Sequence, residues 1–174
     1  MVERPSLKFL EDVSRCDGKE LTPLRDIKSG TPASPALMGL LVDTLVDDDM
    51  NAQIGGSWLL AAYLKDGVQL AQAQIAQLSA ALANMRDGFG RLHICQAAEH
   101  LTVPGEKASA FAAFYRASAE SDNTFLRAWA PSGLFHLASH HPVYMNTARD
   151  LVEKALSDPA PSVRARARKT LAGE

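Results

Sequence analysis

The chain has 174 residues, of which 47% are hydrophobic and 22% are charged, as is ordinary for a soluble globular protein. This length fits one domain with a substantial buried core. The formal net charge of -2 argues against a nucleic-acid binder that relies on overall electrostatic attraction. Aromatic residues make up only 6% of the chain. Ala and Leu must therefore supply much of the packing, which suits helices that approach closely.

The cysteines and the N-terminal segment indicate a cytoplasmic protein. Cys16 and Cys95 lie far apart and form no CxxC pair, so we expect two reduced thiols and neither a disulfide framework nor a thiolate metal site. Residues 1–13 contain acidic side chains and no long apolar run, unlike a signal peptide. No window reaches the roughly 20 apolar residues that a membrane-spanning helix needs.

Residues 1–30 differ in pattern from the rest and are expected to form an N-terminal extension that caps a helical domain of residues 31–174. A short helix is predicted near residues 8–13. Thr22 followed by Pro23 is typical of a helix N-cap with proline at the first helical position. A Ser-Gly-Thr-Pro segment then interrupts the chain.

From Pro35 onward, apolar residues recur at intervals of three and four, which is the pattern of amphipathic helices. An acidic loop of three aspartates at 47–49 is expected to be solvated or to favour the N-terminus of the following helix. No alternating β-branched run occurs, so the sequence predicts an all-α fold. The helices group into four pairs, near residues 35–65, 73–102, 106–140 and 146–172.

Two features inside the predicted helices carry specific expectations. Gly55-Gly56 lies within a helix pattern and predicts close packing against a neighbouring helix. Pro131 lies within the second helix of the third pair, where it removes a backbone hydrogen bond and clashes with the previous turn. We therefore predict a kink or break between Ala130 and Gly133.

The second helices of the four pairs align on an apolar residue that is followed by small or apolar residues four and eight positions later. The first positions of this alignment are Ile54, His93, Leu126 and Val163. They are separated by 39, 33 and 37 residues, which are periods typical of helical solenoids. Ile94 would serve as well as His93. Because one pair cannot bury its apolar face alone, stacked pairs are expected to share a continuous core.

The tail, residues 157–171, carries the clearest copy of this pattern. A Pro-containing loop with one aspartate leads into a helix that keeps small residues at every fourth position. Ser162 is placed to cap this helix. Asp158 is placed to reach the amides of the helix or to pair with Arg164.

Asp122 and Arg127 repeat this arrangement one pair earlier. The string resembles the inner turn of a HEAT repeat, with the best match over residues 106–172. The resemblance implies a right-handed α-α superhelix, a short HEAT-like solenoid of about four helical hairpins, with Asp and Arg pairing between adjacent repeats. In the first two hairpins the Arg position holds Gly55 and Ile94, so the ladder is not expected to run the full length. Tetratricopeptide repeats, the alternative, would show a fixed Trp, Gly-Tyr and Pro pattern that this chain lacks.

In HEAT-like stacks the second helices line the concave wall, and the resemblance places a partner-binding surface there. Trp and Arg are the residues most enriched in binding hot spots, so Trp129, beside two arginines, is the expected centre. Its alternative role is packing between hairpins, with the arginines solvating the last helix. The predicted partner-binding residues are Trp129, Arg127, Arg166, Gln96, Glu99 and Lys169. Ser57 and Ser132 occupy related positions.

The sequence offers no constellation for catalysis, a cofactor or a metal. His136, His140 and His141 invite a metal interpretation because residues four apart share a helix face. No Cys lies nearby, and the helix dipole accounts for histidines at a helix C-terminus. Gly-rich phosphate loops, GxSxG and HExxH are missing. We therefore expect no metal, no cofactor and no enzymatic activity.

The resemblance implies a non-enzymatic scaffold or adaptor that binds a protein partner on its concave surface. HEAT-like folds also include alkylbase DNA glycosylases, which use aromatic and Arg residues with an essential Asp on that wall. Trp58, Trp129 and Arg127 are candidates for such roles, but no Asp accompanies them, so a DNA-binding protein or glycosylase is the alternative. A further alternative is one part of a larger solenoid, whose exposed apolar end face would drive homodimer formation.

Overall fold

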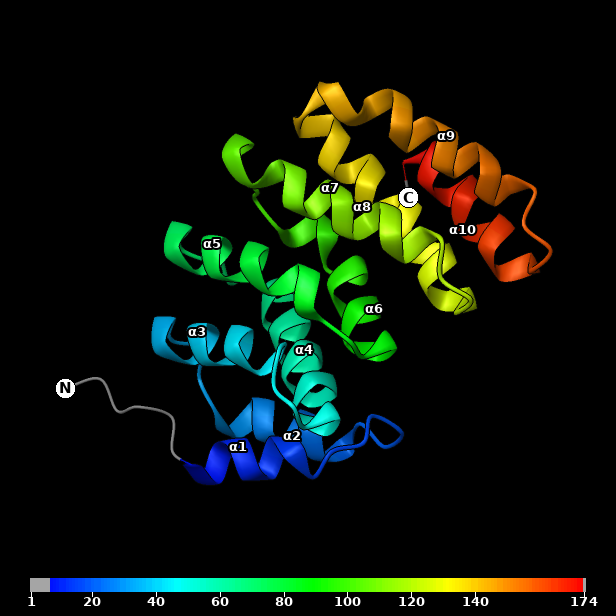
Figure 1. Ribbon diagram of the computed structural model, residues 1–174. Coiled ribbons are helices and arrows are strands. Elements are labelled where there is room, and N and C mark those ends of the chain that lie inside the picture. Colours follow the sequence, from blue (N-terminus) through cyan, green and yellow to red (C-terminus); the bar gives the residue numbers. More distant parts are fainter. Residues whose placement is uncertain (1–6, 174) are drawn as a thin grey trace.

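The computed structural model describes residues 7–173 of the chain (Figure 1). Every regular element in this range is helical, which confirms the predicted all-α class. No helix among these residues is both long enough and apolar enough to cross a bilayer. The α-helices are α1 (Leu7–Ser14), α2 (Thr22–Gly30), α3 (Pro35–Thr44), α4 (Met50–Lys65), α5 (Gln72–Ala81), α6 (Gly88–Gln96), α7 (Gly105–Ala119), α8 (Thr124–His140), α9 (Met145–Leu156) and α10 (Pro161–Ala172). Three short 3-10 helices are η1 (Leu82–Asn84), η2 (Ala98–His100) and η3 (Pro142–Tyr144).

The helices from α3 onward follow one another in pairs that are stacked along one direction (Figure 1). The second helices α4, α6, α8 and α10 contact one another in that order, and the first helices α3, α5 and α7 do the same. The second helices begin at residues 50, 88, 124 and 161. Their spacings of 38, 36 and 37 residues are more regular than those predicted from the apolar residues alone.

The described part of the N-terminal segment packs on α4 through both α1 and α2. Val13, Cys16 and Leu24 are buried and belong to the same core as the following helices. The short helix predicted near residues 8–13 is confirmed as α1. Thr22 is the first residue of α2 rather than its cap, and Leu21 occupies the cap position without a side-chain hydrogen bond.

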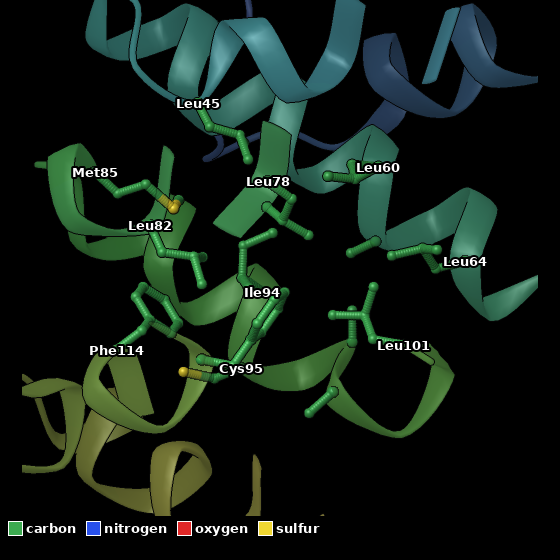
Figure 2. Close-up of a cluster of buried hydrophobic side chains, with 14 of the residues drawn as sticks. Leu45, Leu60, Leu64, Leu78, Leu82, Met85, Ile94, Cys95, Leu101 and Phe114 are labelled. Carbon is green, nitrogen blue, oxygen red and sulfur yellow. The ribbon is translucent and has the colours of Figure 1, made fainter. Parts of the chain in front are cut away.

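One continuous core runs from α1 to α9, and each pair contributes to it. Figure 2 shows its middle, where Leu60 of α4, Leu78 of α5 and Ile94 of α6 converge. A smaller cluster of buried side chains joins the last three helices; its members are Ala128, Val152, Ala155, Val163 and Ala167. Each pair therefore buries its apolar surface against its neighbours as well as within itself.

The close packing predicted at Gly55 and Gly56 is confirmed. A Cβ atom on Gly55 would lie 2.8 Å from Cγ1 of Val13 in α1, and one on Gly56 would lie 1.8 Å from Oγ1 of Thr44 in α3. The two glycines therefore let α4 approach one helix on each side.

Of the kink or break predicted near Pro131, the break is absent, because α8 is continuous from Thr124 to His140. A proline in a helix interior costs about 3 kcal/mol in isolation. Here α7, α9 and α10 all pack on α8, and Pro131 itself is buried. Gly133 is so close to α7 that a Cβ atom would lie 2.7 Å from the ring of Tyr115. Tertiary packing therefore holds the helix through the proline.

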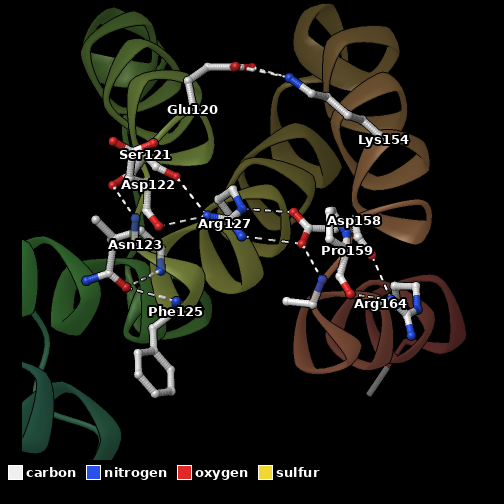
Figure 3. Close-up of polar contacts among 12 residues, drawn as sticks. Glu120, Ser121, Asp122, Asn123, Phe125, Arg127, Lys154, Asp158, Pro159 and Arg164 are labelled. Carbon is white, nitrogen blue, oxygen red and sulfur yellow. Dashed lines mark hydrogen bonds and ion pairs between the residues drawn. The ribbon is translucent and has the colours of Figure 1, made fainter.

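A polar ladder joins the loops that precede the second helices (Figure 3). Arg127 donates from Nε to Oδ2 of Asp158 at 2.8 Å, and from Nη1 to the carbonyl oxygens of Ser121 and Asp122. It therefore connects the loop of its own pair to the loop of the next pair. The predicted contact between Asp and Arg of adjacent pairs is confirmed, with Asp158 supplying the carboxylate.

Arg127 is the fourth residue of α8, and the fourth residue of every second helix makes a related contact. Gln53 of α4 donates to the carbonyl of Asp47 at 2.6 Å and accepts the N–H of Asp87, in the next pair, at 3.2 Å. Arg91 of α6 donates to Oγ of Ser118 in the next pair at 2.9 Å.

In α10 the fourth residue is Arg164, which donates to the carbonyls of Asp158 and Pro159 in its own loop. The Arg positions assigned to Gly55 and Ile94 are thus in the wrong register, and a polar side chain is present in all four pairs.

The predicted cap of the last helix is also wrong. Ser162 is the second residue of α10, and the cap position is held by Ala160. The N–H of Ala160 donates to Oδ1 of Asp158 at 2.8 Å. The hydrogen bond from Arg127, together with this one from Ala160, holds the pKa of Asp158 below its usual range. The acidic loop behaves as predicted, since Asp49 caps α4 by accepting the N–H of Asn51.

Replacing Gly56 with Ala should destabilise the fold. Overpacking of a core costs about 1–3 kcal/mol, while Ala gains about 0.5–1 kcal/mol over Gly in a helix. We expect Gly56→Ala to lower the melting temperature by about 5 °C, measured by circular dichroism. Gly105→Ala is the control, because no atom lies within 4 Å of its added Cβ. Equal melting temperatures for the two variants would contradict the packing argument.

Removing the Arg127 side chain should weaken the junction between the last two pairs. We expect Arg127→Ala to lower the melting temperature more than Arg116→Ala, which removes an exposed arginine from α7. A double-mutant cycle with Asp158→Ala should be non-additive, because the two residues share one contact. Additive losses would show that the contact contributes nothing to stability.

Candidate partner-binding groove

Two neighbouring cavities hollow the face formed by η2, α8 and α10. The first has a volume of about 240 Å³ and the second of about 340 Å³. The first is lined by Gln96, Trp129, Ser132, Phe135, Ser139, Arg166 and Thr170, among others. The second is lined by Leu101, Val103, Tyr115, Leu137 and His140, among others. Both include Ala98, Glu99, Gly133 and His136, so we treat them as one feature, the α8 groove.

A stack of Trp129 and Arg166 forms one wall of the α8 groove. The guanidinium carbon of Arg166 lies 4.0 Å from the centroid of the Trp129 ring, which is within cation–π range. Nε and Nη2 of Arg166 donate to Oγ of Ser132 at 3.3 and 3.2 Å. Oγ of Ser132 also lies 2.7 Å from Oγ1 of Thr170. One edge of the guanidinium, that of Nε and Nη2, is thereby held in place.

Four of the six predicted binding residues line this groove. They are Trp129, Arg166, Gln96 and Glu99. Lys169 is exposed on α10, three positions after Arg166, and does not line either cavity.

Arg127 lies apart from these residues, because it belongs to the loop ladder and lines a separate hollow with Asp158. Residues two apart on a helix point about 200° apart. Arg127 therefore cannot share the face of Trp129.

The sequence prediction did not connect His136 and Ser139 with Trp129 and Ser132. These four residues follow one another along α8 at intervals of three, four and three, and all line the first cavity. This spacing places them on one face of the helix. The spacing is visible in the sequence, where the prediction considered His136 only as a candidate metal ligand and did not include Ser139.

The histidines at the end of α8 lie close together without forming a metal site. The rings of His136 and His140 meet edge to face with centroids 5.1 Å apart. Nε2 of His141 donates to the carbonyl of Val103 at 2.8 Å. Burial and the neighbouring His140 lower the pKa of His136. No group of three His, Cys, Asp or Glu side chains within residues 7–173 is arranged to hold a metal ion.

The nucleophilic side chains of the groove are not activated. Cys95 is fully buried beside Phe114 (Figure 2), and burial raises the pKa of its thiol to about 12. Its sulfur is therefore protonated at neutral pH. Ser132 bonds to Arg166 and Thr170, and no imidazole among residues 7–173 is hydrogen-bonded to it. The groove thus offers contact surfaces for recognition rather than a nucleophile with its base.

Comparisons of the chain with protein-family models, curated proteins and solved structures gave no match. The interpretation of the groove therefore depends on its own chemistry. It offers an aromatic face, a fixed guanidinium, one carboxylate, imidazoles and an apolar hollow. These are the groups that interfaces use to recognise protein side chains.

Ser57, which the sequence placed beside the binding residues, is fully buried. Its Oγ lies 2.8 Å from Nδ1 of His93 on α6. Burial lowers the pKa of His93 to about 4, and the charge of Lys65 acts in the same direction. This pair is part of the packing between α4 and α6.

The buried His93 should make the fold sensitive to acid. Its pKa is near 6.5 when unfolded and about 4 when folded, so the unfolded state binds more protons between these values. Stability should therefore be complete above pH 6.5 and fall by up to about 3 kcal/mol as the pH approaches 4. Urea unfolding across this range would measure the loss. His93→Gln should flatten the pH dependence, whereas His140→Gln, at an exposed position, should retain it. An unchanged profile for His93→Gln would contradict the assignment.

Proposed function

We propose that the protein is a cytoplasmic, non-enzymatic HEAT-like helical repeat that binds an extended segment of a protein partner in the α8 groove. Three features support a short right-handed α-α superhelix of about four hairpins. The second helices recur every 36 to 38 residues, they contact one another in chain order, and a polar side chain occupies the fourth position of each. These periods lie within the range of about 33 to 47 residues that helical solenoids cover, between the periods of tetratricopeptide and HEAT repeats.

The stack of Trp129 and Arg166 is the observation that carries the proposal. Both side chains are only partly buried, and both line the first cavity. The adjoining cavity, with Leu101, Val103 and Leu137, has room for an apolar side chain. A partner segment lying along α8 would fill both cavities. Trp and Arg near the centre of a contact surface commonly dominate binding energy.

Binding to DNA is the less well supported alternative. The groove holds the carboxylate of Glu99 in the same cavity as Arg166, and the chain has a net charge of -2. Affinity for duplex DNA depends mainly on many cationic contacts to phosphates. On this side of α10, Lys169 is the only described residue that adds positive charge to that of Arg166, and it lines neither cavity.

Filling the groove should abolish partner binding. Linear peptides selected from a random display library on the intact chain should bind, and Ser139→Phe should weaken them by at least about tenfold, as loss of one central contact commonly does. Ser139 is exposed and lines the first cavity, so the added ring occupies space without removing core packing. Isothermal titration calorimetry measures the affinity, and circular dichroism measures the melting temperature.

Ser109→Phe is the matched control, because Ser109 is exposed on α7 and lines neither cavity of the groove. Peptides should bind this variant as they bind the unmodified chain. Amide NMR shifts on peptide addition should cluster in residues 96–103 and 129–141. Failure to select any peptide, or peptides that ignore Ser139→Phe, would overturn the proposed function.

A further inference from the structure

The charge of Arg166 has no counter-ion within residues 7–173. The ion pairs there involve other cations, such as Arg127 with Asp158 and Lys154 with Glu120. A guanidinium carries five N–H groups. One N–H group on Nε and one on Nη2 donate to Ser132. The other three N–H groups have no acceptor in the described chain.

These three donors are held ready for a ligand. The guanidinium lies on the face of Trp129 and is fixed by Ser132, so little rotational freedom remains to be lost on binding. Because Arg166 lines the first cavity, the free donors are accessible from the groove. Burial lowers the pKa of Arg166, and the charge of Glu99 acts in the opposite direction without forming a salt bridge to it.

Glu99 is the one carboxylate lining the groove, yet it does not neutralise Arg166. Its Oε1 lies 3.3 Å from Nε2 of His100, its side chain is 65% exposed, and it makes no hydrogen bond to Arg166. It does place negative charge opposite the α10 wall. A phosphate, with up to two negative charges, would be repelled more strongly than a single carboxylate.

We propose that Arg166 is the anion-binding point of the α8 groove, and that the partner segment presents an Asp or Glu carboxylate to it beside an apolar side chain in the second cavity. The inference rests on the proposed function. A guanidinium with parallel free N–H groups matches a carboxylate in geometry. Lys169, three positions later on the same helix, adds positive charge to this wall.

Peptides selected on the intact chain provide the first test. The sequences should be enriched in Asp or Glu at one position and in an apolar residue at a fixed distance from it. Glu→Gln in a selected peptide should lower the affinity about tenfold, as expected for loss of a partly buried, charge-assisted hydrogen bond. The Nε–H resonance of Arg166 should shift with the acidic peptide and not with its Gln counterpart.

Variants of Arg166 give the second test. Arg166→Gln should weaken acidic peptides about tenfold, and selection on Arg166→Glu should enrich Lys or Arg at the same peptide position. Arg168→Gln is the matched control, since Arg168 is exposed on the same helix and makes no side-chain contact with a polar group of residues 7–173. Melting temperatures verify that each variant is folded.

The outcomes separate this inference from the proposed function. Peptides that lose binding in Ser139→Phe but show no acidic preference, or tolerate Arg166→Gln, would overturn the carboxylate assignment and leave the groove as a binding site. A short DNA duplex is the second probe. Binding of the duplex at low salt that is lost in Arg166→Gln and retained in Arg168→Gln would assign the donors to phosphate and overturn the proposal.

Discussion

The polar side chain at the fourth position of each second helix is the contact on which the rest of the structure depends. It donates to carbonyls in the preceding loop or reaches into the next pair, as Arg127 and Gln53 do in both directions. Buried or half-buried loop carbonyls that lack a donor are costly. Because Gln53 and Arg127 each satisfy two loops, they link the spacing and rotation of the consecutive pairs that they join. The alignment of η2, α8 and α10 around one groove follows from that rotation.

Two positions later in each second helix, the residue varies and the surface changes with it. These sixth residues are Gly55, His93, Trp129 and Arg166. Gly55 admits α1, and His93 is packed against Ser57. In the last two pairs the same position holds the stacked side chains that line the groove. The fourth residue of each second helix is therefore always polar and makes structural contacts. The sixth residue packs against neighbouring helices in the first two pairs and lines the groove in the last two.

The sequence predicted the helical class and the pairs because apolar periodicity is a direct consequence of burial on one helix face. It misplaced the register of the first two pairs because the buried residues Ala52 and Gly90, in the third position, are too small to stand out. It allowed for a break at Pro131 because the cost of a proline was judged from α8 alone. The packing of three other helices on α8 was not visible in the sequence. Arg127 was grouped with Trp129 through closeness in sequence, although helical geometry separates them.

The groove is difficult to explain by stability alone. Its floor includes Ala98 and Gly133, and hollows arise where side chains are small. An exposed cation–π contact contributes about 0.5–1 kcal/mol, whereas half-burying an unpaired guanidinium has a desolvation cost of its own. A core side chain at position 166 would remove that cost and could close the first cavity. The chain instead keeps a partly exposed tryptophan against a cation with three free donors, and the carboxylate ligand that we propose would supply the missing acceptor.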